Sequence, residues 1–149
     1  MRADALRIRE NVPLRYDDSR EHYTTAQGLY RAQRGDEDDE VENIENELST
    51  LDFRQGDYPS ARARNEKLLA AAEARHGPHD PKVASRCNNL AKVLVKLGEF
   101  EEAVAVCERA LRILEREGND ESTTILADTH KTMGSVSYTH LTLPTILLV

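Results

Sequence analysis

The stretch that decides the fold is "NNLAKVLVKLGEFEEAVAVCERALRILE", residues 88–115. On both sides of Gly98 its apolar residues recur every three or four positions, which is the spacing of amphipathic helices. Glycine tolerates the backbone conformation that ends a helix and reverses the chain, so Gly98 predicts a turn between two helices. The sequence therefore predicts a pair of antiparallel helices, each with a buried face.

The same pattern occurs 42 residues earlier in the chain. Four residues recur at this offset: Gly56, Asp57, Tyr58 and Ala61 match Gly98, Glu99, Phe100 and Ala103. In both copies a large apolar residue and then a small one precede the glycine, as Leu48–Ser49 and Leu90–Ala91. A third copy begins at "ILADTHKTMG", with Met133–Gly134 in the same place. Helix pairs that recur at a fixed period indicate a solenoid.

These positions resemble the tetratricopeptide repeat family, in which a large and a small residue precede a glycine, an aromatic residue and an alanine. The matching positions are Leu48, Gly56, Tyr58, Ala61, Leu90, Ala91, Gly98, Phe100, Ala103 and Ala110. The linker "HGPHDPKVA" (residues 76–84) and the period of 42 resemble the kinesin-light-chain type. Asp52 and Leu94 stand where the family usually has an aromatic residue. The resemblance implies an all-α, helix-turn-helix solenoid, that is, a tetratricopeptide repeat array, here truncated.

Small residues are expected where two helices approach closely. Ser49, Ala91 and Gly134 occupy this position in the first helices, and Ala103 faces it from a second helix. Pro81 is expected to open a helix, because its missing N–H is not needed there.

The repeats divide the chain into five segments. We expect a partial or degenerate helical repeat at 1–40, tetratricopeptide-like repeats at 41–84 and 85–118, the first helix of a truncated further repeat at 119–135, and a non-native tail at 136–149. The spacing is irregular in one place, because Gly35 and Gly56 leave room for only one helix. The acidic block Asp36–Glu40 precedes that helix, and acids suit a helix N-terminus.

The tail "SVSYTHLTLPTILLV" (residues 135–149) has no charged residue, unlike the chain before it. Its segment Val136–Thr145 resembles a translated sequencing-library adapter. This resemblance predicts that the native sequence diverges near Val136 and that the parent protein is longer. An edge strand or a hydrophobic peptide ligand is the alternative interpretation. The tail is far shorter than the roughly 20 apolar residues that span a bilayer.

The composition excludes several classes of protein. With 149 residues, 32% of them charged, and a net charge of −7, the chain does not have the basic excess of a nucleic-acid-binding protein. Its two cysteines, Cys87 and Cys107, lie on apolar helix faces and are expected to be buried free thiols. Free thiols are typical of a reducing compartment, so we expect a cytoplasmic protein without a membrane segment.

No catalytic motif is found in the sequence. Phosphate-binding glycine loops, HExxH and GxSxG are all missing from it. His76, His79 and Asp80 are close together in sequence but have no further strong ligand beside them, which argues against a metal site. We therefore expect no enzyme activity, no cofactor and no metal.

The resemblance implies that the first helices of the pairs line a concave face that binds a protein or peptide partner. The polar residues expected on it are Asn46, Arg54, Asn88, Lys92, Lys96 and Lys131. Amides can bond to a peptide backbone and basic groups to its acids, so the hypothesis is an extended, acidic peptide. Three alternatives stay open: ordinary solvated helix surfaces, a regulatory segment of a larger signalling protein such as an ATPase, and a structural or self-associating array. The oligomeric state is open too.

Overall fold

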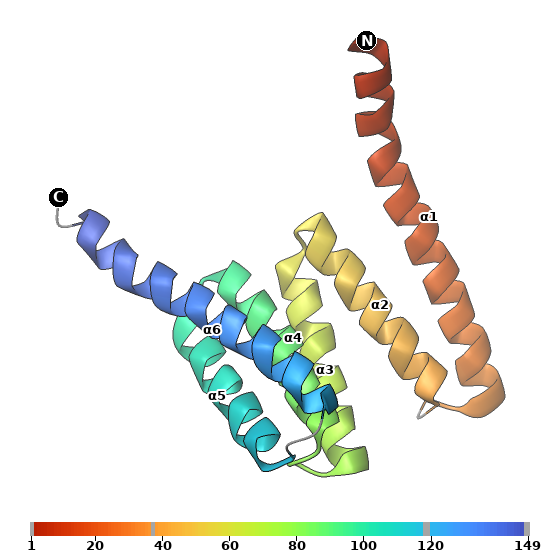
Figure 1. Cartoon of the computed structure of the whole chain (residues 1–149). Coiled ribbons are helices and arrows are strands. Elements are labelled where there is room, and N and C mark those ends of the chain that lie inside the picture. Colours follow the sequence, from red (N-terminus) through yellow and green to blue (C-terminus); the bar gives the residue numbers. More distant parts are fainter. Residues whose placement is uncertain (1, 37, 118–119, 148–149) are drawn as a thin grey trace. The chain divides into compact units, whose positions relative to one another are not determined.

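The computed structural model describes the backbone of residues 2–36, 38–117 and 120–147, and the side chains of residues 15–36, 38–116, 124–136 and 138. These residues form helices and no strand: α1 (Arg2–Arg34), α2 (Asp39–Gln55), α3 (Tyr58–His76), α4 (Pro81–Leu97), α5 (Phe100–Glu117) and α6 (Asp120–Leu147) (Figure 1). The prediction of an all-α chain is confirmed. Because α6 continues to Leu147, the interpretation of the tail as a strand is wrong.

Glycines with a positive φ follow the ends of four helices at a constant spacing. They are Gly35, Gly56, Gly77 and Gly98, with φ angles of 92°, 81°, 87° and 79°. Successive members of this series are 21 residues apart, so a 42-residue repeat contains two of them, one after each helix. Gly35 therefore corresponds to Gly77 and not to Gly98. The spacing that looked irregular in the sequence is the regular spacing of single helices.

The repeat extends back into α1. Tyr16 lies 42 residues before Tyr58, and Tyr58 lies 42 residues before Phe100. Tyr58 and Phe100 are the first residues of α3 and α5, the second helices of their pairs. The part of α1 from Tyr16 to Arg34 thus has the register of a second helix.

Equivalent aspartates cap the first helices. The side chain of Asp38 accepts a hydrogen bond from the backbone N–H of Glu40 at 2.9 Å, and that of Asp80 does so from Lys82 at 2.8 Å. These caps satisfy donors that the first turn of a helix leaves unpaired. The acidic block before α2 is therefore a helix N-terminus, as predicted. Pro81 opens α4, also as predicted.

The chain contains two compact units, residues 1–57 and 58–149. In the first unit, α1 packs against α2. Ile44, Leu48 and Leu51 of α2 form its buried cluster. The residues of α1 that pack against this cluster are Tyr16, Tyr23, Ala26 and Tyr30. Three of these are tyrosines seven residues apart, which places their rings along one face of the helix.

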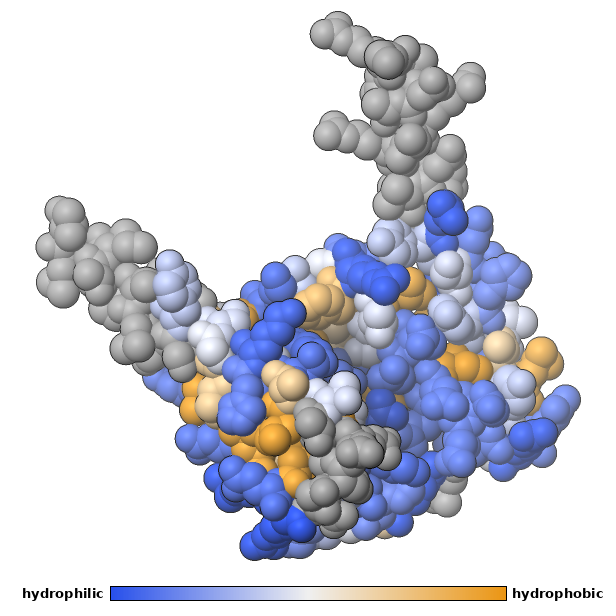
Figure 2. Space-filling model, viewed as in Figure 1, coloured by the Kyte–Doolittle hydropathy of each residue, from blue (hydrophilic) through white to orange (hydrophobic). Residues whose placement is uncertain are grey.

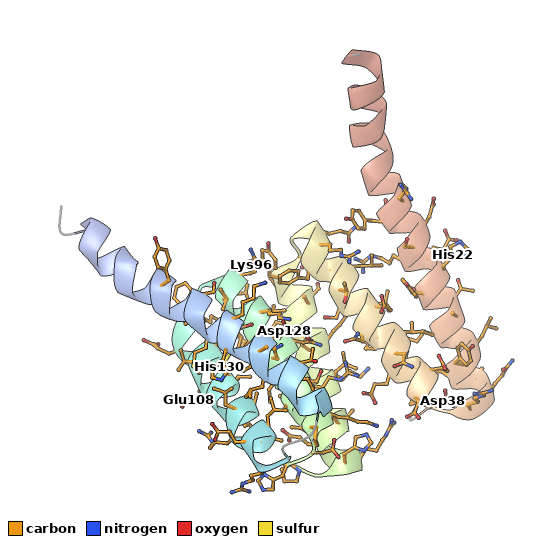
Figure 3. The ribbon with its side chains drawn as sticks, viewed as in Figure 1. His22, Asp38, Lys96, Glu108, Asp128 and His130 are labelled. Atoms are coloured by element: carbon orange, nitrogen blue, oxygen red, sulfur yellow. The ribbon has the colours of Figure 1, made fainter. Side chains whose placement is uncertain are left out.

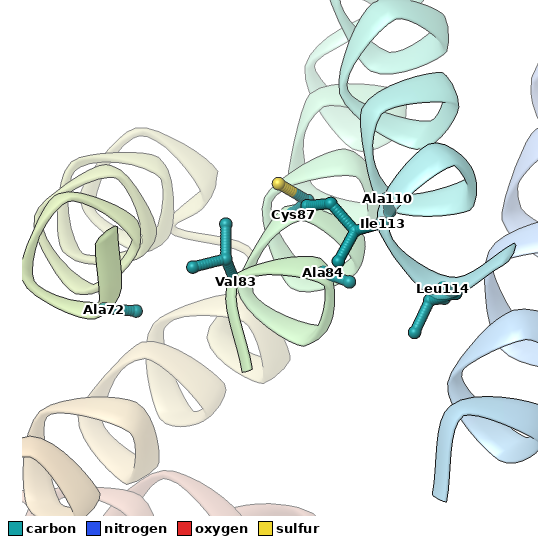
Figure 4. Close-up of a cluster of buried hydrophobic side chains, with 7 residues drawn as sticks. All are labelled: Ala72, Val83, Ala84, Cys87, Ala110, Ile113 and Leu114. Atoms are coloured by element: carbon teal, nitrogen blue, oxygen red, sulfur yellow. The ribbon is translucent and has the colours of Figure 1, made fainter. Parts of the chain in front are cut away.

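In the second unit, α4 is the central helix and packs against α3, α5 and α6. Figure 4 shows one buried cluster, to which α3, α4 and α5 contribute as follows: Ala72 from α3, Val83, Ala84 and Cys87 from α4, and Ala110, Ile113 and Leu114 from α5. A second cluster contains Leu90, Leu94, Ala103 and Val136. Together these clusters hold α4 in place on three sides.

The small residues differ in their surroundings. Ala91 and Ala103 are completely buried, and Ser49 is nearly so. Gly134, by contrast, is exposed, and a Cβ atom built on it would meet no atom within 4 Å. The prediction of a close helix approach at Gly134 is therefore wrong, because no described side chain packs over that position.

Alanine is expected to have opposite effects at two glycines of the second unit. Gly98→Ala should lower the free energy of unfolding by about 1 kcal/mol, because φ is 79° there and a Cβ is strained in this region. Gly134→Ala should raise it by about 0.5–1 kcal/mol, because Gly134 lies inside α6 with open space around it. Urea unfolding followed by circular dichroism checks both values. Shifts of the same sign would contradict this assignment of the two glycines.

Candidate functional site

The predicted binding residues of the second unit lie on α4 and α6, which pack against each other. Asn88 of α4 is buried, with 4% of its surface exposed. Its Oδ1 atom accepts a hydrogen bond from the Thr132 hydroxyl of α6 at 3.2 Å, and Thr132 is buried as well. The amide of Asn88 therefore joins the two helices instead of lining an open surface.

Three lysines lie on the same two helices as this contact. Lys92 lies one turn after Asn88, and its Nζ atom is 3.4 Å from a carboxylate oxygen of Asp128 on α6. Lys96 lies in the last turn of α4 and Lys131 on α6, and both are exposed. Figure 3 labels Lys96 on α4 and Asp128 on α6. The structure thus places Lys92 and Lys96 on one helix and Lys131 on the helix that packs against it.

The charge of this group is positive although the whole chain is acidic. Three lysines and one aspartate leave a net charge of +2 on these four side chains, against −7 for the chain. The Lys92–Asp128 pair is about half exposed, with relative side-chain exposures of 42% and 56%. Such surface pairs contribute only about 0–1 kcal/mol, so a partner's acid can replace Asp128 at little cost.

The surface around the site is mainly polar. Figure 2 shows hydrophilic residues over most of the visible described surface, with hydrophobic ones in several separate places, the most extended of them on the part that belongs to α5 and α6. Among the described residues, the large hydrophobic side chains that are clearly exposed are Leu29 and Tyr138. We therefore base the candidate site on charge and not on an apolar patch.

The other two predicted residues belong to the first unit. Asn46 of α2 is half-buried, and its backbone carbonyl accepts a hydrogen bond from the Thr50 hydroxyl at 3.1 Å. Arg54 is exposed in the last turn of α2, where it lines a pocket of about 350 Å³ between α1 and α2. The pocket was not predicted, because its other wall comes from α1, and the repeat pattern did not place that segment beside α2.

Two buried acids on α2 were not predicted from the sequence. Asp52, with 1% of its surface exposed, pairs with Arg20 of α1 at 2.7 Å. Glu45, with 7% exposed, accepts a hydrogen bond from Gln27 of the same helix α1. The repeat offset offered a signal, because 42 residues later these two positions hold Leu94 and Cys87 of the apolar core. An acid at a core position of a repeat indicates a partner on the neighbouring helix.

Ion pairs from α3 to α5 and to Glu99, the residue before α5, were not predicted either. Arg62 of α3 bonds to Glu66 on its own helix at 2.7 Å and pairs with Glu99 and, at 3.1 Å, with Glu102. All three nitrogen atoms of the Arg62 guanidinium group contact these acids, so Arg62 links elements of the second unit and is not a free binding group. Spacing along the sequence does not reveal such pairs, because Glu99 and Glu102 lie far from Arg62 in the chain.

Neither the two cysteines nor Asp80 lies in an environment that would make it reactive. Cys87 and Cys107 are free and buried, as predicted. Burial raises the pKa of each thiol to about 11, so both stay protonated near neutral pH and are poor nucleophiles. Asp80 is the cap of α4. Within the described residues no group of three or more histidine, cysteine or acidic side chains could hold a metal ion.

Comparison with known proteins identifies the class of this chain. Residues 40–116, just over half of it, match the tetratricopeptide repeat family. The chain belongs to this family, so the resemblance seen in the sequence is confirmed. Its fold is an all-α tetratricopeptide repeat array. Proteins with these repeats are typically scaffolds that bind other proteins.

One solved structure with the same fold is the crystal structure of BtubC (BKLC) from P. vanneervenii. The two share 22% sequence identity with a TM-score of 0.66, and the match covers 83% of this chain and 52% of BtubC. The chain therefore spans about half the length of that protein. No curated protein matches the sequence. In the described part of the chain, none of the helices has the length and apolar character needed to cross a membrane.

Proposed function

We propose that this chain is a cytoplasmic protein-interaction scaffold that binds an extended, acidic peptide segment along the face formed by α4 and α6. It has no catalytic role. The proposal is supported by the packing of α4, which carries Lys92 and Lys96, against α6, which carries Lys131, and by the pair that Lys92 forms with Asp128 across these helices. Carboxylates of a peptide would pair with these ammonium groups, as charge-assisted hydrogen bonds.

The buried polar contact next to Lys92 supports a fixed binding face. The Asn88–Thr132 hydrogen bond holds α4 against α6 at one point, with Lys92 one turn away. A fixed spacing of charges favours binding, because less conformational entropy is lost when the peptide docks. Asn88 thus takes part in the proposal as the residue that positions α6, while the lysines make the direct contacts.

A peptide selection tests the proposal. Phage displaying random 12-residue peptides are selected on the whole chain, and the affinity of the recovered peptides is measured by fluorescence anisotropy. We expect peptides enriched in Asp and Glu, and at least tenfold weaker binding to the double variant Lys92→Glu, Lys96→Glu. The expected loss corresponds to at least about 1.4 kcal/mol of binding free energy.

The matched control carries the same charge change on α5. Arg112 and Arg116 are exposed, and both lie outside the proposed face. The variant Arg112→Glu, Arg116→Glu should bind the selected peptides with little change beyond the general effect of net charge. Equal losses in the two double variants, or selected peptides without acidic residues, would disprove the proposed face.

A further inference from the structure

We propose that the pocket between α1 and α2 is a second contact site, which binds the carboxylate of an acidic side chain in the partner's peptide. This inference rests on the proposed function, because it takes the ligand to be a peptide. The pocket lies entirely within the first unit and has a volume of about 350 Å³. Sites for small ligands begin at roughly 300 Å³, so one side chain with its flanking backbone fits a pocket of this size.

Two arginines from different helices supply the positive charge. Arg15 of α1 and Arg54 of α2 both line the pocket and both are exposed. Neither guanidinium group forms an ion pair within the part of the chain that the structure describes, whereas Arg20 of α1 is held by Asp52. A guanidinium group can bind a carboxylate through two parallel hydrogen bonds. The free arginines are therefore the charge-recognition groups of the pocket.

The rest of the lining suits a peptide. The hydroxyls of Ser19 and Thr50 each donate to a backbone carbonyl four residues earlier in their own helix, at 2.7 and 3.1 Å. Their oxygen lone pairs remain as acceptors for peptide N–H groups. Tyr16, Tyr23 and Leu51 contribute apolar surface to the same pocket. The pocket thus offers cations for an acidic side chain, hydrogen-bond acceptors for the peptide backbone, and apolar surface for neighbouring apolar side chains.

Glu47 determines how many negative charges the pocket can accept. Two arginines and one glutamate give these three side chains a net charge of +1. A carboxylate with a single negative charge neutralises them. A phosphate group carries about −1.5 to −2 at neutral pH, so it would exceed the available charge and be repelled by Glu47. The charges therefore favour an aspartate or glutamate side chain over a phosphorylated one.

The test uses the whole chain and three blocked pentapeptides. The probe is acetyl-Gly-Leu-Glu-Leu-Gly-amide, and the matched peptides carry Gln or phosphoserine in the central position. Binding is followed by NMR through the Nε–H resonances of the arginines, assigned with Arg15→Gln and Arg54→Gln. The Glu peptide should shift the resonances of Arg15 and Arg54 saturably, and the Gln peptide should bind at least tenfold more weakly. Each arginine variant should weaken binding of the Glu peptide about tenfold.

Glu47→Gln provides a variant with the opposite effect. Removal of its negative charge should tighten binding of the Glu peptide severalfold and of the phosphoserine peptide by a larger factor. A structural defect would weaken both instead. If the wild-type chain binds the phosphoserine peptide more tightly than the Glu peptide, the assignment of a carboxylate ligand is wrong.

The double variant Lys92→Gln, Lys96→Gln separates this inference from the proposed function. It should leave the arginine shifts caused by the Glu peptide unchanged. Equal binding of the Glu and Gln peptides overturns the pocket. Loss of Glu-peptide binding in the lysine variant, together with unchanged binding in Arg15→Gln and Arg54→Gln, also overturns the pocket. That second result is still consistent with a binding face on α4 and α6.

Discussion

Leu94→Ala is expected to lower the free energy of unfolding of the second unit by about 3 kcal/mol, within the range of about 2–5 kcal/mol found for buried leucines. Leu94 is completely buried in the cluster with Leu90, Ala103 and Val136. These neighbours come from three different helices, so the surroundings can collapse only partly into the space that the smaller side chain leaves. Urea unfolding followed by circular dichroism at 222 nm measures the change.

Lys96→Ala is the matched control for this prediction. Lys96 is two residues further along α4 and is exposed, so its removal should change the free energy of unfolding by no more than about 0.5 kcal/mol. A loss of under about 1 kcal/mol for Leu94→Ala would show that this part of the core is not packed as described.

Arg20→Met should weaken the pairing of α1 with α2 by about 2–3 kcal/mol. It leaves the Asp52 carboxylate, which is 1% exposed, without the guanidinium group that lies 2.7 Å away. Loss of one partner of a buried pair costs about 3–5 kcal/mol, and we expect less here because Arg20 is one-third exposed. Hydrogen exchange of the backbone amides of α1 and α2 reports the change, as faster exchange in these helices.

The double variant Arg20→Met, Asp52→Leu should recover most of this loss. Asp52 occupies the repeat position that Leu94 occupies 42 residues later, so a leucine suits the site. Buried ion pairs are often replaced by apolar residues without a net loss of stability. If the double variant is as unstable as Arg20→Met alone, the interpretation of Asp52 as a charged residue at an apolar repeat position is incorrect.

Most of the fold followed from local patterns. The glycine turns, the aspartate before α2 and the proline that opens α4 act through the backbone within a few residues, so they can be recognised along the chain. The position of α1 was missed because the 21 residues between Gly35 and Gly56 were interpreted as an irregular spacing. Tyr16 indicates the correct register of α1, since Tyr16, Tyr58 and Phe100 are separated by 42 residues each.

The candidate site was harder to predict. Surface positions on one helix follow from its periodicity, and this placed Lys92, Lys96 and Lys131 on α4 and α6. Whether a polar side chain faces solvent or a neighbouring helix depends on how the helices cross. Asn88 is the example, because its amide is buried against Thr132. The pocket with Arg15 and Arg54 depends on the pairing of α1 with α2, and the periodicity of a single helix does not predict which helix it pairs with.

The central claim, that α4 and α6 together form the binding face, is tested most directly by a hydrogen-exchange footprint of a selected acidic peptide. The whole chain is compared with and without the peptide at saturating concentration. We predict that the amides protected in the second unit are those of α4 around Lys92–Lys96 and of α6 around Lys131. Protection confined to α3 and α5, with α4 and α6 unchanged, would contradict the claim.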